Sequence, residues 1–274
     1  MVTHTGSFAL RLASASPDPD GPPRFEVDAE LRSRLGTYCP QVLNSGGQTP
    51  VPGVPFWSLD AWAEGEHPEP GEVPAAAAEE LGAALSRLHA LPCTGYGRLR
   101  DGRGELRGEA RGFLAGLESR LERSFARDGN WESFPLAKAA PALLPLVQAV
   151  EPELRARLDA AAKQKGVVLH GDLHERQLLV QAGALSALLD FGDAWVGPAA
   201  FDLAAYAYFH GWAALPGVLA GYSAPPEPRE VELFSLLLAF HHISRAYTLE
   251  RPSRRSFAVR HLKLTFARLG LEAA

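Results

Sequence analysis

The chain has 274 residues, with 27 lysines and arginines against 32 aspartates and glutamates, so its formal net charge is −5. This length suffices for one large domain or two modest ones, each with its own core. The lack of a basic excess argues against nucleic acid or an anionic membrane surface as the partner of this protein.

Cysteine content and hydropathy indicate the cellular compartment and whether the chain spans a membrane. Cys39 and Cys93 are the only cysteines, too few for a disulfide framework and without the CxxC spacing of zinc or redox sites. No window approaches 18 uninterrupted apolar residues, and the first residues lack the pattern of a signal peptide. We therefore expect a cytoplasmic protein without a membrane span; the oligomeric state stays open.

The first 65 residues predict a small unit of strands and one helix. Residues 7–13 alternate like a strand, and an amphipathic helix is predicted to begin at residue 24 and to end at Gly36. Two further strands are predicted within 40–62, around a Gly/Pro turn. A polar, proline-rich connector follows at 63–74.

The rest of the chain predicts a mostly helical unit with a compact group of strands. A helix is expected between Pro74 and Pro92, and another over 105–127. Pro145 and Pro152 are expected to kink or break a helical region at 142–163. Short strands are predicted around 166–192, and later helices are predicted at about 199–210, 227–250 and 254–270. We therefore predict an α+β fold with two lobes, 1–65 and 66–274, and a cleft between them.

Two aspartates follow short apolar runs in the predicted strand group. Asp172 lies in VVLHGDLH, and Asp190 lies in ALLDFGDA. A single aspartate after a strand is usually a cap of the next turn. Two in succession predict carboxylates that emerge at one edge, where they would repel each other unless a cation or substrate lay between them.

The spacing of polar groups around these aspartates favours phosphoryl transfer with magnesium. Carboxylate and amide oxygens are the ligands that Mg²⁺ prefers. Gln177 follows Asp172 by five residues, which matches the D-x-x-x-x-N spacing of phosphoryl-transfer enzymes. Asp190-Phe191-Gly192 is the metal-holding triplet of protein kinases.

The ordered pair of motifs resembles the aminoglycoside phosphotransferase-like branch of the kinase-like fold, a group of small-molecule kinases. The residues that carry the resemblance are HGDLHERQLLV and ALLDFGDAWVGPAAFDLA, and PFWSLDAWAEGE is similar to the hinge segment of that family. The resemblance implies a two-lobed protein-kinase-like fold and transfer of the γ-phosphoryl group of ATP, with Mg²⁺, to a hydroxyl of a small molecule.

The resemblance also implies residue roles. Asp172 would be the catalytic base, while Asp190 and Gln177 would bind the metal. Arg11, Asp60, Ala61 and Trp62 would contact the nucleotide. His170 would brace the HGD loop, and Asp202 would support the same loop by hydrogen bonds.

Three features depart from the family pattern. The amide is Gln177 rather than the usual asparagine, which displaces the oxygen by about 1.5 Å. Arg11 replaces the usual lysine and is preceded by only ten residues. Either the true start codon lies upstream, or the β lobe is truncated, lacks the glycine-rich hairpin and covers the nucleotide incompletely. The acidic partner of Arg11 could be any of three residues, namely Glu26, Asp28 and Glu30.

The acceptor is less defined. The segment 205–250 mixes Glu227, Glu230, Glu232 and Glu250 with histidines and Arg245, so it is not the acidic pocket that a polycationic aminoglycoside needs. Aromatic residues Trp195, Tyr206, Tyr208, Phe209 and Trp212 could line a pocket or fill the core. Two other functions compete with a kinase: a kinase-fold protein that binds nucleotide or a partner without efficient turnover, and a metallohydrolase with His170, Asp172 and His174 as ligands.

Overall fold

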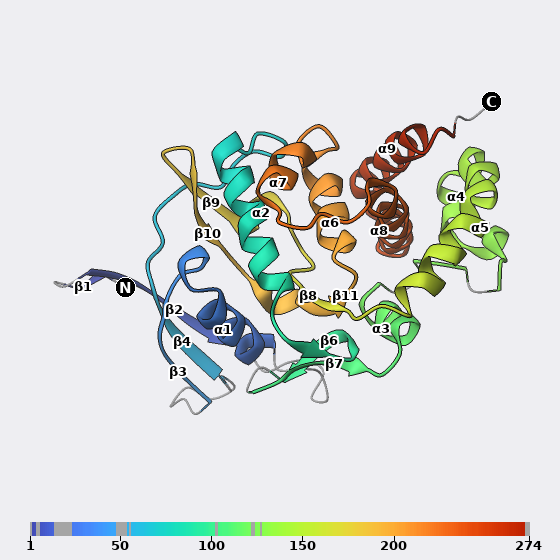
Figure 1. Cartoon of the computed structure of the whole chain (residues 1–274). Helices are drawn as coiled ribbons and strands as arrows, with labels where there is room; N and C mark the ends of the chain where they lie inside the picture. Colours follow the sequence, from blue (N-terminus) through green and yellow to red (C-terminus); the bar gives the residue numbers. More distant parts are fainter. Residues whose placement is uncertain are drawn as a thin grey trace.

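The computed structural model describes residues 2–3, 6–13, 24–47, 54, 56–101, 104–121, 124–126 and 128–271. An antiparallel sheet with strand order β1-β2-β4-β3 lies at one end of the molecule (Figure 1). Its strands are β1 (Val2–Thr3), β2 (Gly6–Ala13), β3 (Val42–Gly46) and β4 (Phe56–Ala61).

Helix α1 (Arg24–Leu35) packs against this sheet, and a short 3₁₀ turn (Gly36–Tyr38) follows it. The four-residue spacing of Val27, Leu31 and Leu35 places these side chains on one face, and all three are buried. Arg11 of β2 lies opposite Ser58 of β4 in the sheet register. The predicted strands and helix of this segment are therefore confirmed.

The glycine-rich hairpin was expected to be missing. Among the described residues before β2, the short strand β1 is present, and its Val2 pairs with Ser7 of β2. Residues 4–5 lie outside the described residues.

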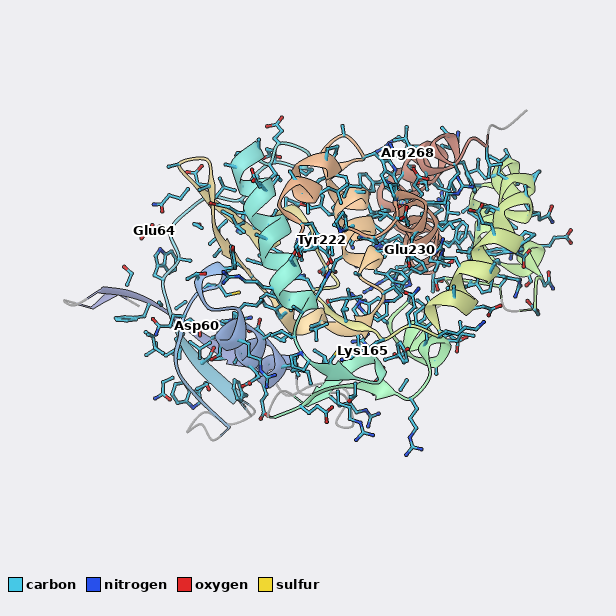
Figure 2. All side chains as sticks on the ribbon, viewed as in Figure 1. Asp60, Glu64, Lys165, Tyr222, Glu230 and Arg268 are labelled. Atoms are coloured by element: carbon cyan, nitrogen blue, oxygen red, sulfur yellow. The ribbon has the colours of Figure 1, made fainter. Side chains whose placement is uncertain are left out.

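The remainder of the chain is mostly helical, and its last helices lie at the opposite end of the molecule from the N-terminal sheet (Figure 1). The helices are α2 (Ala75–His89), α3 (Phe113–Arg120), α4 (Pro135–Ala139), α5 (Leu144–Ala161), α6 (Ala200–His210), α7 (Leu215–Gly221), α8 (Pro228–Thr248) and α9 (Pro252–Arg268). Side chains labelled in Figure 2 mark the two ends: Asp60 belongs to the sheet, and Glu230 and Arg268 to the helices.

Two further sheets lie within this helical part. One has the order β5-β7-β6-β11-β8 and the other is the hairpin β9-β10. Their strands are β5 (Cys93–Thr94), β6 (Tyr96–Asp101), β7 (Leu106–Ala110), β8 (Val167–Leu169), β9 (Leu178–Gln181), β10 (Ala184–Leu188) and β11 (Trp195–Gly197). The strand group predicted around 166–192 is therefore confirmed.

The single helix predicted over 105–127 is wrong. Residues 106–110 form β7, which pairs with β6, and only 113–120 are helical. Gly108 permits the close approach of these two strands, because a Cβ at this position would lie 2.4 Å from the carbonyl oxygen of Tyr96 on β6. The apolar residues whose regular spacing predicted one helix therefore belong to two elements, the strand β7 and the helix α3.

Of the kink or break predicted in the 142–163 region, a break is absent, since α5 runs without interruption over Leu144–Ala161. Pro145 lies in the first turn of α5, where the missing N–H has no partner to lose. Pro152 lies inside the helix, which continues to Ala161. The predicted later helices are confirmed as α6, α8 and α9, and none of the helices in the described ranges is long and apolar enough to cross a membrane.

Candidate functional site

The loop 170–172 follows β8 and is fixed by hydrogen bonds on both sides. Gly171 has a φ of 82°, and a Cβ there would lie 2.7 Å from the carbonyl oxygen of Asp193, so glycine is required. His170 is fully buried, and its ring bonds the carbonyl of Leu189 through Nε2 at 2.8 Å. Its Nδ1 accepts a hydrogen bond from the Asp172 amide at 3.3 Å. The predicted bracing role of His170 is thus consistent with contacts at both ring nitrogens.

Asp202 of α6 is hydrogen-bonded to the same loop. Its carboxylate accepts hydrogen bonds from the amides of His170 at 2.8 Å and Gly171 at 2.9 Å. It also pairs with His89 Nε2 at 2.9 Å, and His89 in turn bonds the hydroxyl of Tyr222. Burial alone would raise the pKa of Asp202, but the hydrogen bond and charge of His89 outweigh burial, and the pKa is lowered. The predicted support of the loop by Asp202 is confirmed.

Asp172 itself is partly exposed, with 30 % of its side-chain surface accessible. Burial raises the pKa of this carboxyl, His174 opposes the shift, and the nearby charge of Asp193 adds to it. His174 Nε2 lies 3.5 Å from Asp172 Oδ2. A carboxylate with a raised pKa, within reach of solvent, is a suitable proton acceptor.

The second aspartate, Asp190, begins a tight turn with an unusual backbone. It has a φ of 58° and a ψ of 78°, and its side chain caps the 3₁₀ turn Phe191–Asp193 by accepting the Gly192 amide at 3.1 Å. Phe191 is buried against His170, with ring centroids 4.7 Å apart. A non-glycine residue in the left-handed region is uncommon and costs free energy, so the surrounding contacts must stabilise this turn.

The two aspartate loops are joined directly. Leu178 of β9 pairs with Leu188 of β10, and the Leu189 amide donates to the Gln177 carbonyl at 2.8 Å. The Leu189 carbonyl accepts the hydrogen bond from His170 described above. Residue 189 therefore connects the loop of Asp172, the backbone of Gln177 and the turn of Asp190.

A buried ionic network links the N-terminal sheet to the Asp190 turn. Arg11 Nη1 lies 2.5 Å from Asp28 Oδ2, so Asp28 is the partner of Arg11 among the three acids considered. The other oxygen of Asp28 accepts the Phe191 amide at 2.8 Å. Arg32 bonds both Asp28 and Asp60, each at 3.0 Å. The position of α1 is therefore coupled to the geometry of the Asp190 turn.

A cleft of about 470 Å³ lies between the N-terminal sheet and the β9-β10 hairpin. Six of the seven predicted site residues line it, and they come from both sides: Arg11, Asp60, Ala61, Trp62, Gln177 and Asp190. Its size falls in the range of small-molecule pockets. Arg32 Nη2 and Asp60 Oδ1 are buried beside the cleft and have no hydrogen-bond partner in the described part of the chain.

The seventh residue, Asp172, lines a different hollow of about 740 Å³. We call it the acceptor hollow after the role predicted for Asp172; it lies against α6, α8 and α9, and its lining shares no residue with that of the cleft. Arg176 lines the acceptor hollow and its neighbour Gln177 lines the cleft, so the turn 175–177 borders both spaces.

Only part of the predicted acceptor lining is found there. Tyr208 and Phe209 line the acceptor hollow, whereas Trp195 and Tyr206 are buried in the core. None of the four glutamates considered, Glu227, Glu230, Glu232 and Glu250, lines it. The charged residues on α9 were missed, because this helix lies beyond the segment with recognisable motifs.

Gln177 is buried, and its amide lies next to His174, with the two Nε2 atoms 3.2 Å apart. His174 Nδ1 accepts the Arg176 amide at 3.1 Å, so the hydrogen of this ring is on Nε2. A hydrogen at Nε2 can bond an amide oxygen but not an amide nitrogen, so we assign the Gln177 oxygen to the side facing His174.

The metallohydrolase hypothesis is contradicted by this geometry. Both ring nitrogens of His170 are hydrogen-bonded within the protein, so neither is available as a metal ligand. In the described ranges no group of three histidine, cysteine, aspartate or glutamate side chains could hold a metal ion.

Two contributors to the site were not predicted from the sequence. Arg32 lies four residues after Asp28, a spacing that brings opposite charges together on a helix and could have indicated the pair. Asp193 lines the acceptor hollow together with Asp172 and carries no motif beyond its place after the Asp-Phe-Gly triplet.

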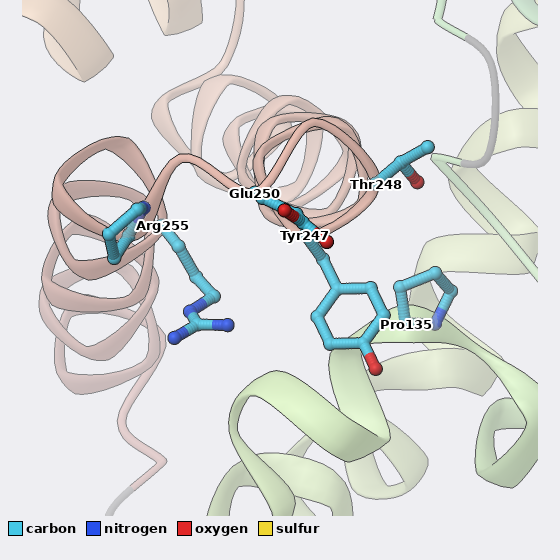
Figure 3. A pocket seen from close by; sticks show the side chains of 6 residues that line it. Pro135, Tyr247, Thr248, Glu250 and Arg255 are labelled. Atoms are coloured by element: carbon cyan, nitrogen blue, oxygen red, sulfur yellow. The ribbon is translucent and has the colours of Figure 1, made fainter.

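A further hollow of about 600 Å³ lies on the other side of the turn between α8 and α9. Figure 3 shows Tyr247, Thr248 and Arg255 around it, with Pro135 of α4 opposite. Neither aspartate loop contributes to its lining.

The fold places this protein in the class of kinase-like proteins. It combines a small sheet and one helix with a helical unit, and two linked aspartate loops lie near a cleft. The model of the phosphotransferase enzyme family (APH) matches residues 1–234. The chain belongs to this family, and the predicted resemblance is confirmed. A search of curated proteins found no significant match.

Solved structures agree in fold. A thermostable mutant of aminoglycoside phosphotransferase APH(4)-Ia in its apo form has a TM-score of 0.64 and 14 % identity, with 98 % of this chain and 89 % of that chain covered. A ternary complex of a thermostable mutant of the same enzyme, with AMP-PNP and hygromycin B, also has a TM-score of 0.64 and 14 % identity, over 97 % and 87 % of the two chains. The macrolide 2'-phosphotransferase MphH from Brachybacterium faecium has a TM-score of 0.54 and 19 % identity, over 95 % and 86 %.

Proposed function

We propose that this phosphotransferase moves the γ-phosphoryl group of ATP, with Mg²⁺, to a hydroxyl of a small molecule. The observation that carries the proposal is the junction at residues 175–177, a turn that borders both the cleft lined by Asp190 and the acceptor hollow lined by Asp172. A similar structure contains AMP-PNP and hygromycin B, a nucleotide analogue beside a small molecule. The proposed lobes are 1–65 and 66–274, because Glu66 already pairs with Val180 of β9.

The cleft fits a nucleotide by its donors and acceptors. Arg11 offers a cation for phosphate oxygens, and its pairing with Asp28 holds it in place. Ala61 is the last residue of the inner strand β4, Trp62 follows it, and both are proposed to contact the base. The unpartnered Arg32 Nη2 and Asp60 Oδ1 favour a polar ligand or ordered water here, because buried polar groups need partners.

The residues near the junction suit a hard cation. Asp190 offers a carboxylate that keeps one oxygen clear of the Gly192 contact, and Gln177 offers an amide oxygen with a second lone pair beyond His174. Mg²⁺ is usually bound by one or two protein oxygens together with phosphates and water, which agrees with this small set. When bound there, it would supply positive charge that neutralises the phosphate oxygens.

Asp172 is the proposed base. A hydroxyl of the acceptor donates its proton to the Asp172 carboxylate while its oxygen forms the bond to the γ-phosphorus. The bond between that phosphorus and the β,γ-bridging oxygen breaks, and ADP leaves. Asp202 and His170 keep the Asp172 backbone in place, so that the carboxylate is positioned before the substrate binds.

The experiment that tests this function is transfer of labelled phosphate from γ-³²P-ATP to a panel of hydroxyl compounds, with and without Mg²⁺. We expect an acceptor-dependent product that requires Mg²⁺. Tight ATP binding without transfer to any acceptor would instead support the second candidate, a kinase-fold protein that binds nucleotide without turnover, which the glutamine at position 177 favours. We place the activity in the cytoplasm, since ATP is the donor and both cysteines, Cys39 and Cys93, are free.

A further inference from the structure

The acceptor hollow is rich in arginine. Three acidic residues line it, namely Asp172, Glu175 and Asp193. Five arginines line it, which we call the arginine rim: Arg176, Arg245, Arg251, Arg254 and Arg260. The whole chain carries a formal net charge of −5, so this local excess of positive charge does not follow from the overall composition.

The arginines of the rim lie on the acceptor side of the site. Arg245 belongs to α8, Arg254 and Arg260 belong to α9, and Arg251 lies between these helices. The cleft proposed for the nucleotide is lined by residues from 9–67 and 177–190 only. The charge on α8 and α9 therefore faces the acceptor rather than the nucleotide.

The rim is not neutralised by ion pairs within the described part of the chain. Other arginines near these helices are paired: Arg268 contacts Glu232 at 3.1 Å, and Arg229 contacts Glu153 at 2.6 Å. No such pair is formed there by any of the five rim arginines. The five arginines outnumber the three acidic residues of the lining, so like charges repel one another there, and a bound anion would relieve this repulsion.

The positive lining continues inward to the proposed base. A recess of about 200 Å³ shares Asp172, Asp193 and Arg245 with the acceptor hollow and adds Arg98 and Arg120. Both spaces that contain Asp172, the acceptor hollow and the recess, are thus lined by guanidinium groups.

Aromatic side chains provide the remaining wall. Tyr208 stacks on His242 with centroids 4.5 Å apart and meets Phe257 edge-on at 5.2 Å. All three residues line the acceptor hollow. Such a wall suits the carbon body of a ligand whose charged group reaches the arginines.

We infer that the acceptor is an anionic hydroxyl compound, with a carboxylate or phosphate group bound by the arginine rim while its hydroxyl reaches Asp172. This inference rests on the proposed phosphotransferase function. A polycationic acceptor would face repulsion from the rim, whereas arginine is well suited to bind carboxylate and phosphate oxygens in pairs.

The inference is tested first by binding, without turnover. Calorimetry with AMP-PNP and Mg²⁺ at saturation would compare 6-phosphogluconate, glucose and kanamycin as anionic, neutral and cationic probes. We expect 6-phosphogluconate to bind at least tenfold more tightly than the other two. Equal affinities, tighter binding of glucose or kanamycin, or no binding of 6-phosphogluconate would overturn the inference.

Variants on α8 and α9 locate the binding. The double variant Arg245→Gln/Arg254→Gln should weaken 6-phosphogluconate roughly ten- to hundredfold, because each lost contact involves a charged hydrogen bond. Arg255→Gln is the matched control: this arginine follows Arg254 in α9 but lines the separate hollow of Figure 3, so its loss should leave affinity unchanged. Equal losses in both variants, or none in the double variant, would overturn the inference.

A transfer assay separates this inference from the proposed function. Acceptors in three sets, anionic, neutral and cationic, would be tested with γ-³²P-ATP. Transfer to neutral or cationic compounds alone would overturn the anionic acceptor and leave the phosphotransferase in place. Failure of AMP-PNP to bind, together with no transfer to any set, would overturn the proposed function. In that case, calorimetry on the protein without nucleotide would still decide whether the rim binds 6-phosphogluconate.

Discussion

Replacement of Asp202 by asparagine tests how the proposed base is held. Asp202 is fully buried, and its two oxygens accept the amides of His170 and Gly171 and pair with His89. Asparagine has the same shape but only one oxygen, so its NH₂ group must face at least one donor that it cannot satisfy.

The expected cost follows from these contacts. A buried donor left without an acceptor costs about 1–3 kcal/mol, and a hydrogen bond to a charged group contributes about 1.5–3 kcal/mol. We therefore expect Asp202→Asn to lower the free energy of unfolding by about 2–4 kcal/mol. Because a displacement of about 1 Å can cost about a hundredfold in rate, kcat should fall at least tenfold while ATP affinity changes little.

Urea unfolding at pH 7 and steady-state kinetics would measure both effects. The pKa of Asp202 is lowered, so its stabilising contribution is complete above the ordinary aspartate pKa and is lost only as the pH falls through the lower folded-state value. The comparison at pH 7 therefore captures the whole contribution. Asp159→Asn, at an exposed position of α5, is the control and should stay within about 0.5 kcal/mol of the wild type. An Asp202→Asn protein as stable and as active as that control would refute the reasoning.

Three further outcomes are expected. Asp172→Asn should abolish phosphate transfer and leave ATP affinity, measured by calorimetry, within about threefold, since the residue does not line the cleft; transfer at the wild-type rate would exclude it as the base. Gln177→Asn should preserve or raise activity if the amide binds metal, whereas a fall in the unfolding temperature with unchanged metal dependence would indicate a packing role. Burial lowers the pKa of His210 and of His261 to about 4, so the folded state keeps both neutral. Their contribution to stability is complete above the unfolded pKa of about 6.5 and is lost as the pH falls from 6.5 toward 4, by about 3 kcal/mol for each group. Urea unfolding at pH 7, 6 and 5 measures this loss, and an unfolding free energy that is constant over this range would contradict it.

Much of the site could be predicted because its chemistry lies in short local patterns. The strand before Asp172, the five-residue step to Gln177 and the triplet at Asp190 are each readable from neighbouring residues. The hydrogen bonds from Asp202 to the loop were predicted from one motif and are present.

The remaining features depend on contacts between distant segments. Spacing from Arg11 does not distinguish Glu26, Asp28 and Glu30, and the docking of α1 against the Asp190 turn selects Asp28. The arginines of α9 carry no motif, and their meaning depends on the packing of α8 and α9 around the acceptor hollow. The local apolar spacing of 106–110 predicted a helix, but the segment forms a strand because pairing with β6 outweighs that spacing.

The most direct test of the central claim is calorimetric titration of ATP into the wild type and Asp190→Asn, each with and without Mg²⁺. We expect Mg²⁺ to strengthen ATP binding to the wild type at least tenfold and to have almost no effect on the variant. Equal ATP affinity of the wild type with and without Mg²⁺, or a full effect of Mg²⁺ on the variant, would exclude Asp190 as the residue that binds the metal beside ATP.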